Sequence, residues 1–475
     1  MDSINSFIDT ANGILYGYIL IALLVAGGIY FTVRLQFLPT ALLKEAIRTL
    51  LSKNKTERTG MSSFQALMVS TASRVGTGNI IGVTSAILAG GPGAVFWMWV
   101  VAVFGGASAF VESTLAQMYK CRDSHGHFYG GPAYYIKKAL NAPVFGGVFA
   151  VFVILLYMGG FNALCSFNTT DFVCNYARDV PHMTVYVGIA LSLLAGLVIL
   201  GGGKFISRVT QYLVPIMAIG YIVLALAVMV LHIGELPSVI ATILSQAFDI
   251  HSVFGGFLGA AIMMGVKRGL YSNEAGVGSA PNAAASADVK HPVNQGLSQF
   301  LSVFIDTILI CSATAFIILC SGVDAADYVA GTDNTRYLQD CMKASFGAGG
   351  GVLLTSALVI FAYTTLVGNY FYAEQSVRYF YPKANADKRF MMVYRLVAIA
   401  VIFLGSQFEA ALAWNVSDFI MGIMALINIP VCIILGKRAY KALWDYMIQR
   451  NQGKDPVFDP EALLGSAKGM ECWKK

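Results

Sequence analysis

Long apolar runs alternate with short polar segments along the whole chain. A helix needs roughly 20 apolar residues to cross a bilayer. We count eleven runs of this kind, near residues 14–37, 62–89, 92–119, 145–173, 184–201, 208–233, 252–280, 297–320, 350–379, 392–408 and 411–436. The pattern therefore predicts an all-α polytopic membrane protein with eleven transmembrane helices.

Composition indicates lipid rather than water as the main solvent. The chain has 475 residues, 57% hydrophobic and 12% charged, and its mean hydropathy is +0.66. These values lie outside the range of ordinary soluble domains. The 48 glycines fit tightly packed membrane helices, in which small residues let backbones approach one another. We therefore expect the lipid bilayer to surround most of the chain.

Basic residues follow the odd-numbered runs, and the segments after even-numbered runs carry few of them. The first two basic segments hold Lys44, Arg48, Lys53, Lys55 and Arg58, and then Lys120, Arg122, Lys137 and Lys138. Cytoplasmic loops carry such an excess of Lys and Arg. This predicts an external N-terminus, an external loop over 321–349 and a cytoplasmic C-terminus, in a cell (inner) membrane. The net charge of +6 then reports topology and no nucleic-acid partner.

An internal repeat joins the two halves of the chain. Arg74–Ala86 (RVGTGNIIGVTSA) aligns with Arg268–Ala280 (RGLYSNEAGVGSA) at an offset of 194, with six identities in thirteen positions. At the same offset, Glu112 falls on Asp306. Each copy would contain five helices, and an odd number places the two copies in opposite orientations in the membrane. Inverted repeats of this kind are typical of secondary transporters.

The repeat predicts four parts of the chain. Residues 1–60 form an extra N-terminal transmembrane helix and a basic cytoplasmic loop. Residues 61–235 form the first five-helix unit and 250–437 the second, inverted unit. Residues 438–475 form a cytoplasmic tail. The binding site of such a transporter lies near the bilayer midplane, between the two units.

The first helix of each unit is interrupted by a polar, glycine-rich stretch, Val75–Asn79 in one and Tyr271–Gly278 in the other. An unwound backbone frees carbonyl oxygens for a cation and N–H groups for a carboxylate. An amino-acid zwitterion needs both. The alternative is that Gly76, Gly78 and Gly82 only pack helices together.

Two acidic residues, Glu112 and Asp306, lie inside apolar runs. Acids within the membrane are functional candidates, as proton carriers for example. The alternative is that they anchor helix packing or pair with Arg74 and Arg268.

Four motifs resemble one transporter family. GGPGAVFWMWVVAVFG at Gly90–Gly105 is similar to the signature of the sodium:alanine symporter family, also called the alanine or glycine:cation symporters. SRVGTGNIIGV at Ser73–Val83, GVKRGLYSNEAGVGSAPNAAA at Gly265–Ala285 and FAYTTLVGNYFYAE at Phe361–Glu374 agree with it. The resemblance spans essentially the whole chain and implies a LeuT-type fold of two inverted five-helix units.

The resemblance also implies two sets of site residues. Substrate would contact Thr77, Gly78, Asn79, Cys165, Tyr271, Ser272, Asn273, Val277, Thr365 and Asn369. A sodium ion would take backbone carbonyls and side-chain hydroxyls from Ala72, Val75, Phe361, Thr364 and Thr365. The alternative for the two threonines is that their hydroxyls bond back to their own helix, as is common for Thr in apolar helices.

Two departures from the family pattern affect the expected substrate. Asn369 stands where many members have Trp, and Cys165 or a neighbour stands where they have Gln. An Asn in place of Trp would open or polarise the pocket and allow a larger amide substrate such as glutamine. The alternative is that Asn369 faces lipid or another helix, since polar groups often join membrane helices.

We therefore expect sodium-coupled symport of a small neutral amino acid, such as alanine or glycine, by alternating access. The protein would act as a monomer with co-transported Na⁺ and no organic cofactor. The alternatives are symport of glutamine or another larger neutral amino acid, proton-coupled symport through Glu112 or Asp306, and a channel. An internal inverted repeat argues against a channel, and the sequence lacks the clustered His and acidic residues that a membrane enzyme would need.

Overall fold

The computed structural model describes residues 2–35, 39–51, 60–176, 180–248, 259–407 and 410–473. Within them, eight helices are long and apolar enough to cross a membrane. They span Ser6–Arg34, Gly93–Met118, Pro143–Cys174, Met183–Leu200, Gly202–Leu231, Val293–Leu319, Ala348–Phe380 and Ala413–Asn451. The protein is therefore an all-helical multi-pass membrane protein, as the apolar pattern predicts.

Each of these long helices is made of one or more of the labelled elements. They are α1 (Asp2–Ile14), η1 (Leu15–Ile19), α2 (Leu20–Arg34), α6 (Gly93–Met118), α8 (Pro143–Val153), η3 (Ile154–Gly160), α9 (Phe161–Cys174), α10 (Met183–Leu200), α11 (Gly202–Leu231), α16 (Val293–Val303), η4 (Phe304–Cys311), α17 (Ser312–Leu319), α19 (Ala348–Phe380) and α21 (Ala410–Asn451). The elements η1, η3 and η4 are π-helical turns inside otherwise α-helical spans. Such turns often occur at functional sites.

The other three predicted spans are not among these eight long apolar helices. The run near 62–89 consists of α4 (Ser63–Arg74), the π-helical η2 (Gly78–Gly82) and α5 (Val83–Gly90). The run near 252–280 contains α14 (Ala260–Asn273), and its first residues lie outside the described part. The run near 392–408 is α20 (Lys388–Gly405), which carries three basic residues. The count of eleven transmembrane helices thus stays a prediction.

Several segments predicted as loops are structured. The short elements are α3 (Pro39–Leu51), β1 (Cys121–Arg122), β2 (Phe128–Tyr129), α7 (Pro132–Ala139), α12 (Leu236–Ala247), α15 (Pro281–Ala284), η5 (Ala325–Asp327), α18 (Asn334–Phe346), η6 (Ala384–Ala386), α22 (Pro460–Leu464) and η7 (Glu471–Trp473). The last predicted span ends at 436, but α21 continues to Asn451. The predicted boundary at 438 therefore lies inside a helix, because polar residues at its end extend the helix beyond the apolar run.

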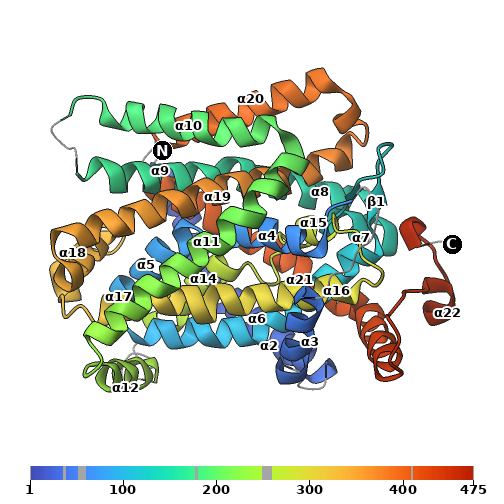
Figure 1. Cartoon of the computed structure of the whole chain (residues 1–475), viewed down its shortest axis with the longest axis horizontal. Coiled ribbons are helices and arrows are strands. Elements are labelled where there is room, and N and C mark those ends of the chain that lie inside the picture. Colours follow the sequence, from blue (N-terminus) through green and yellow to red (C-terminus); the bar gives the residue numbers. More distant parts are fainter. Residues whose placement is uncertain are drawn as a thin grey trace.

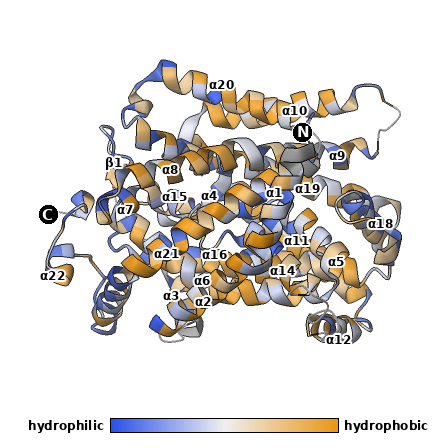
Figure 2. Ribbon diagram, turned by 180° about the vertical axis from the view of Figure 1, so that it is seen from behind, coloured by the Kyte–Doolittle hydropathy of each residue, from blue (hydrophilic) through white to orange (hydrophobic). Residues whose placement is uncertain are grey.

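Both interrupted helices lie in the middle of the bundle. Helix α14 packs along α6 and α5, and α4 packs between α11 and α19. Helices α10 and α20 run side by side at one edge (Figure 1). Polar residues gather at the two ends of the bundle, around β1, α7 and α22 and around α18, with apolar helices between them (Figure 2). This distribution fits a membrane belt across the middle of the helices.

Candidate functional site

The first interruption begins where α4 ends. Helix α4 starts at a capping box, in which the Ser62 hydroxyl accepts from the Gln65 N–H and the Gln65 amide oxygen accepts from the Ser62 N–H. It stops because Val75 adopts an extended conformation, with φ −77° and ψ 91°. The chain then resumes as the π-helical turn Gly78–Gly82. The backbone around Val75 is thus released from the helix, as the glycine-rich pattern predicts.

Asn79 holds the interruption together. Its Oδ1 accepts from the Gly76 N–H at 2.8 Å. Its Nδ2 donates to Asp306 Oδ1 at 2.7 Å and to the Ser272 hydroxyl at 3.0 Å. One amide therefore connects the break in the first unit to the corresponding helix of the second unit.

Asp306 is the acceptor at the centre of this network. Its Oδ2 accepts from the Ser272 hydroxyl at 2.6 Å and from the Thr307 hydroxyl at 3.0 Å. Thr307 in turn accepts from Asn273 Nδ2 at 3.2 Å. Asp306 and its partners are fully buried. The predicted substrate residues Asn79, Ser272 and Asn273 are thus brought together by one carboxylate.

The second interruption follows Asn273. Glu274 has a left-handed φ of 52°, and Gly276 and Gly278 have φ of 84° and 88°, a region that glycine enters without strain. Glu112 on α6 accepts from the Gly276 N–H at 3.4 Å and from Asn428 Nδ2 at 2.7 Å. The acid of each unit therefore holds the interrupted segment of the other unit.

The alternative in which Glu112 and Asp306 pair with arginines does not match the geometry. In the described part of the chain, no ion pair joins either acid to Arg74 or Arg268. Arg268 instead pairs with Asp418 of α21 at 3.1 Å, and Lys267 pairs with the same carboxylate oxygen at 2.8 Å. The two acids anchor backbone and amide groups instead.

The predicted sodium residues form two oxygen pairs. The Thr365 hydroxyl donates to the Ala72 carbonyl at 3.0 Å, across the α4–α19 interface. The Thr364 hydroxyl donates to the Phe361 carbonyl of its own helix at 2.9 Å. Thr364 therefore follows the back-bonding alternative and Thr365 does not. Neutral hydroxyl and carbonyl oxygens are suitable ligands for a hard cation.

Close packing brings the first interruption against α19. A Cβ added at Gly76 would overlap the hydroxyl of Thr365, and one added at Gly78 would lie 2.5 Å from a ring carbon of Tyr271. Glycine is thus required here for the close approach of backbone to side chains. The packing alternative therefore holds for Gly76 and Gly78, and their part in binding stays a prediction.

An aromatic cluster covers the site beside Gly78. The Tyr271 ring lies 4.9 Å from Phe161 and 4.8 Å from Trp414, and the Arg268 guanidinium lies 4.4 Å from the Trp414 ring. Phe161, Trp414 and Asp418 are absent from the sequence-based assignment. Phe161 and Trp414 lie in apolar runs without any local motif, so nothing in the sequence singles them out. Asp418 is an acid inside the apolar run 411–436, the same signal that marks Glu112 and Asp306, so it could have been found.

The other predicted substrate residues occupy distinct positions. Cys165 donates its thiol to the Ala362 carbonyl at 3.3 Å and also contacts the Thr77 side chain. Val277 is buried in the second interruption. Asn369 accepts from the Ser73 hydroxyl at 2.6 Å and donates to Asn162 Oδ1 at 3.0 Å. Asn369 therefore links α4, α9 and α19, as its helix-facing alternative describes.

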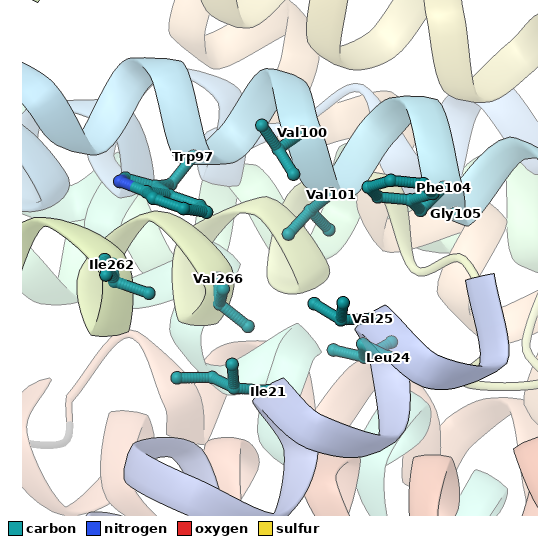
Figure 3. Close-up of a pocket in the computed structure, with 10 residues that line it drawn as sticks. All are labelled: Ile21, Leu24, Val25, Trp97, Val100, Val101, Phe104, Gly105, Ile262 and Val266. Carbon is teal, nitrogen blue, oxygen red and sulfur yellow. The ribbon is translucent and has the colours of Figure 1, made fainter. Parts of the chain in front are cut away.

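A large cavity opens at the end of the molecule that carries the basic loops. It has a volume of about 700 Å³ and extends from the start of α4 to the β1–β2 hairpin and the last turns of α19. We call it the vestibule. A second hollow, between α2, α6 and α14, measures about 30 Å³ and is lined by apolar side chains such as Leu24, Val101 and Val266 (Figure 3). It offers no polar group to a zwitterion.

Known transporters are similar to this chain over almost its whole length. The chain is 42% identical over 467 residues to the probable sodium/glutamine symporter GlnT of Bacillus subtilis, covering 98% of this chain and 95% of that protein. It is 43% identical over 482 residues to the putative sodium/proton-dependent alanine carrier protein YrbD of the same organism, covering 99% and 97%.

A solved structure and a family model complete the comparison. The structure of MhsT in complex with L-phenylalanine matches with a TM-score of 0.58 and 13% identity, covering 80% of this chain and 90% of that one. This shows that the fold is of the LeuT type. The model of the sodium:alanine symporter family matches residues 1–460. The chain therefore belongs to the sodium:alanine symporter family.

Proposed function

We propose that the protein imports a small neutral amino acid, such as alanine or glycine, together with sodium by alternating access. The observation that carries the proposal is the contact of Thr365 with Ala72 at the broken helix, which places neutral oxygens from both units within 3.0 Å. A sodium ion bound there would join the two units. Coupling then requires only that sodium and substrate favour the same conformation.

The binding residues follow from this arrangement. Sodium would replace the hydrogen bonds of Thr364 and Thr365 and take carbonyls of Ala72, Val75 and Phe361. The substrate would lie between the two interruptions. Its contacts would come from Thr77, Gly78, Asn79, Cys165, Tyr271, Ser272, Asn273 and Val277. We propose that Glu112 and Asp306 position these segments and carry no proton.

The conformation supports alternating access with an external N-terminus and a cytoplasmic C-terminus. Arg268 precedes the second interruption in the chain, and Ser286, in the wall of the vestibule, follows it. On the Arg268 side, the Asp418 pairs and the Trp414 contact close the bundle. The vestibule lies at the end with the basic loops, which suits the cytoplasmic face.

Uptake into liposomes that hold the purified protein tests the proposal. Labelled alanine, glycine and glutamine are each supplied with and without an inward sodium gradient. We expect accumulation only with the sodium gradient, with alanine or glycine above glutamine. Uptake that ignores sodium and follows a proton gradient would instead favour the proton-coupled alternative through Glu112 or Asp306.

Glutamine is the second candidate substrate, because Asn369 stands where many family members have Trp. The variant Asn369→Ala tests this candidate. The amide oxygen of Asn369 accepts a hydrogen bond from Ser73, and its amide nitrogen donates one to Asn162. Each of these buried partners, if left unpaired, costs about 1–3 kcal/mol. We expect alanine and glutamine uptake to fall by the same factor, roughly tenfold, with Ser73→Ala as the matched variant. A changed ratio of glutamine to alanine uptake in Asn369→Ala alone would place this amide in the substrate pocket.

A further inference from the structure

The vestibule contains a buried ion pair that the central site does not use. Glu374 and Arg378 lie one turn apart near the end of α19 and line the cavity. Arg378 Nη2 donates to Glu374 Oε1 at 2.6 Å. Glu374 is 1% exposed and Arg378 is 6% exposed. Both charges are therefore removed from bulk water although they border a large cavity.

This pair leaves polar atoms without protein partners. Glu374 Oε2, Arg378 Nε and the amide oxygen of the adjacent Gln375 are buried and make no hydrogen bond within the described residues. An unpaired buried polar group costs about 1–3 kcal/mol, and more when it is charged. Glu374, Gln375 and Arg378 line the cavity, so a turn of these side chains toward it would offer the three atoms to a ligand.

The unpaired atoms have the chemistry of an amino-acid backbone site. Two of them, Glu374 Oε2 and Gln375 Oε1, are acceptors that suit an ammonium group. Arg378 Nε is a donor that suits a carboxylate. The nearby Asp123 is not a comparable acceptor, because its carboxylate already accepts from the N–H groups of His125 and His127.

The pair also lies farther along the helix that carries Thr364 and Thr365. Thr364, Phe371 and Arg378 are spaced seven residues apart, so they share one face of α19. Ten residues separate Thr364 from Glu374, which is about 15 Å along the helix axis. This distance is long enough for a second, separate site. A substrate leaving the central site toward the vestibule would pass along this face.

We propose that Glu374, Gln375 and Arg378 form a second amino-acid site in the vestibule, which holds the zwitterion between the central site and the cytoplasm. The site rests on the proposed function, because its ligand is the transported amino acid. Glu374 and Gln375 bind the ammonium group, and Arg378 binds the carboxylate. It is a release site, so it is reached from the cytoplasmic face.

The test compares the two faces of the membrane. Influx into intact cells reports the half-saturating concentration at the outer face, and uptake into everted vesicles reports it at the cytoplasmic face. The probe is whichever of labelled alanine, glycine and glutamine the wild type transports fastest. Glu374→Gln keeps an acceptor for Arg378. We expect it to raise the half-saturating concentration at least tenfold at the cytoplasmic face and less than twofold at the outer face.

Two further variants keep the test informative. Met392→Leu changes an apolar, 47% exposed residue of the same vestibule and should leave both values unchanged. Arg378→Lys keeps the charge but removes Nε, and it should raise the cytoplasmic value as Glu374→Gln does. A mutation in the transporter cannot change the equilibrium distribution of the substrate. If the half-saturating concentration rises at the cytoplasmic face alone, the ratio of maximal influx to maximal efflux should therefore fall by the same factor.

The possible outcomes separate the two proposals. Equal changes at both faces in well-folded Glu374→Gln protein, judged by size-exclusion chromatography, would show that the pair only supports packing. No change at either face would show that the vestibule holds no site. Absence of sodium-driven transport in the wild type would instead overturn the proposed function itself.

Discussion

Replacing Thr365 by Val is expected to raise the sodium concentration for half-maximal uptake about 10- to 100-fold. The change keeps the shape of the side chain and removes its hydroxyl, which lies 3.0 Å from the Ala72 carbonyl. A hydrogen-bonding group facing a charge contributes about 1.5–3 kcal/mol, and each 1.4 kcal/mol is a factor of ten. The measurement is uptake into liposomes over a series of sodium concentrations.

Ser356→Ala is the matched control for this variant. Its hydroxyl lies on the exposed face of the same helix and bonds only to the Val352 carbonyl. The control should leave the sodium dependence unchanged. If Thr365→Val protein folds and keeps the wild-type sodium dependence, then sodium does not bind at this interface.

Replacing Asp306 by Ala is expected to abolish transport, whereas Asp306→Asn should retain sodium-driven uptake within about tenfold of the wild type. Alanine leaves the donors of Asn79, Ser272 and Thr307 without their acceptor. At about 1–3 kcal/mol for each group, the loss is comparable to the whole stability of a typical domain. Asparagine keeps one acceptor for Asn79, and hydroxyl hydrogens can rotate toward new partners.

Asp306→Asn also distinguishes a carboxylate that only anchors the interruption from one that carries a proton. If Asp306 only positions the interruption, uptake by Asp306→Asn should keep the pH dependence of the wild type. If Asp306 carries a proton, Asp306→Asn should fold, bind substrate and fail to respond to a proton gradient. Thermal melting in detergent checks that Asp306→Asn is folded, and the parallel change Glu112→Gln tests the corresponding acid of the other unit.

The places of most helices and of the first interruption could be predicted from the sequence, whereas α14 continues through Asn273, so the second interruption starts later than the predicted Tyr271. Apolar runs fix where helices cross the bilayer, because the bilayer sets their length. The interruption at Val75 is visible because glycine and polar residues cluster inside an otherwise apolar run, which is typical of the broken helices of transporters. Glu112 aligns with Asp306 in the repeat, and each of them accepts a hydrogen bond from the interrupted segment of the other unit.

The partners of these groups could not be predicted. Asn428, Trp414 and Asp418 all come from α21, far along the chain from the groups they contact. Their side chains meet the site only because of how α21 packs against the core, and no short motif encodes that packing. The ends of helices beyond the apolar runs were missed for a related reason, since hydropathy marks the membrane and not the end of the helix.

The bond between Asn79 and Asp306 has a consequence for biosynthesis. These two residues are 227 positions apart, and the acceptor is made long after the donor. At a synthesis rate of 5–20 residues per second, the delay is roughly 10–45 s. During that time the amide of Asn79 is already in the membrane and its final partner does not exist. Nascent protein should therefore depend on the insertion machinery, or on a chaperone within the membrane, to shield the first interrupted helix until the second unit arrives.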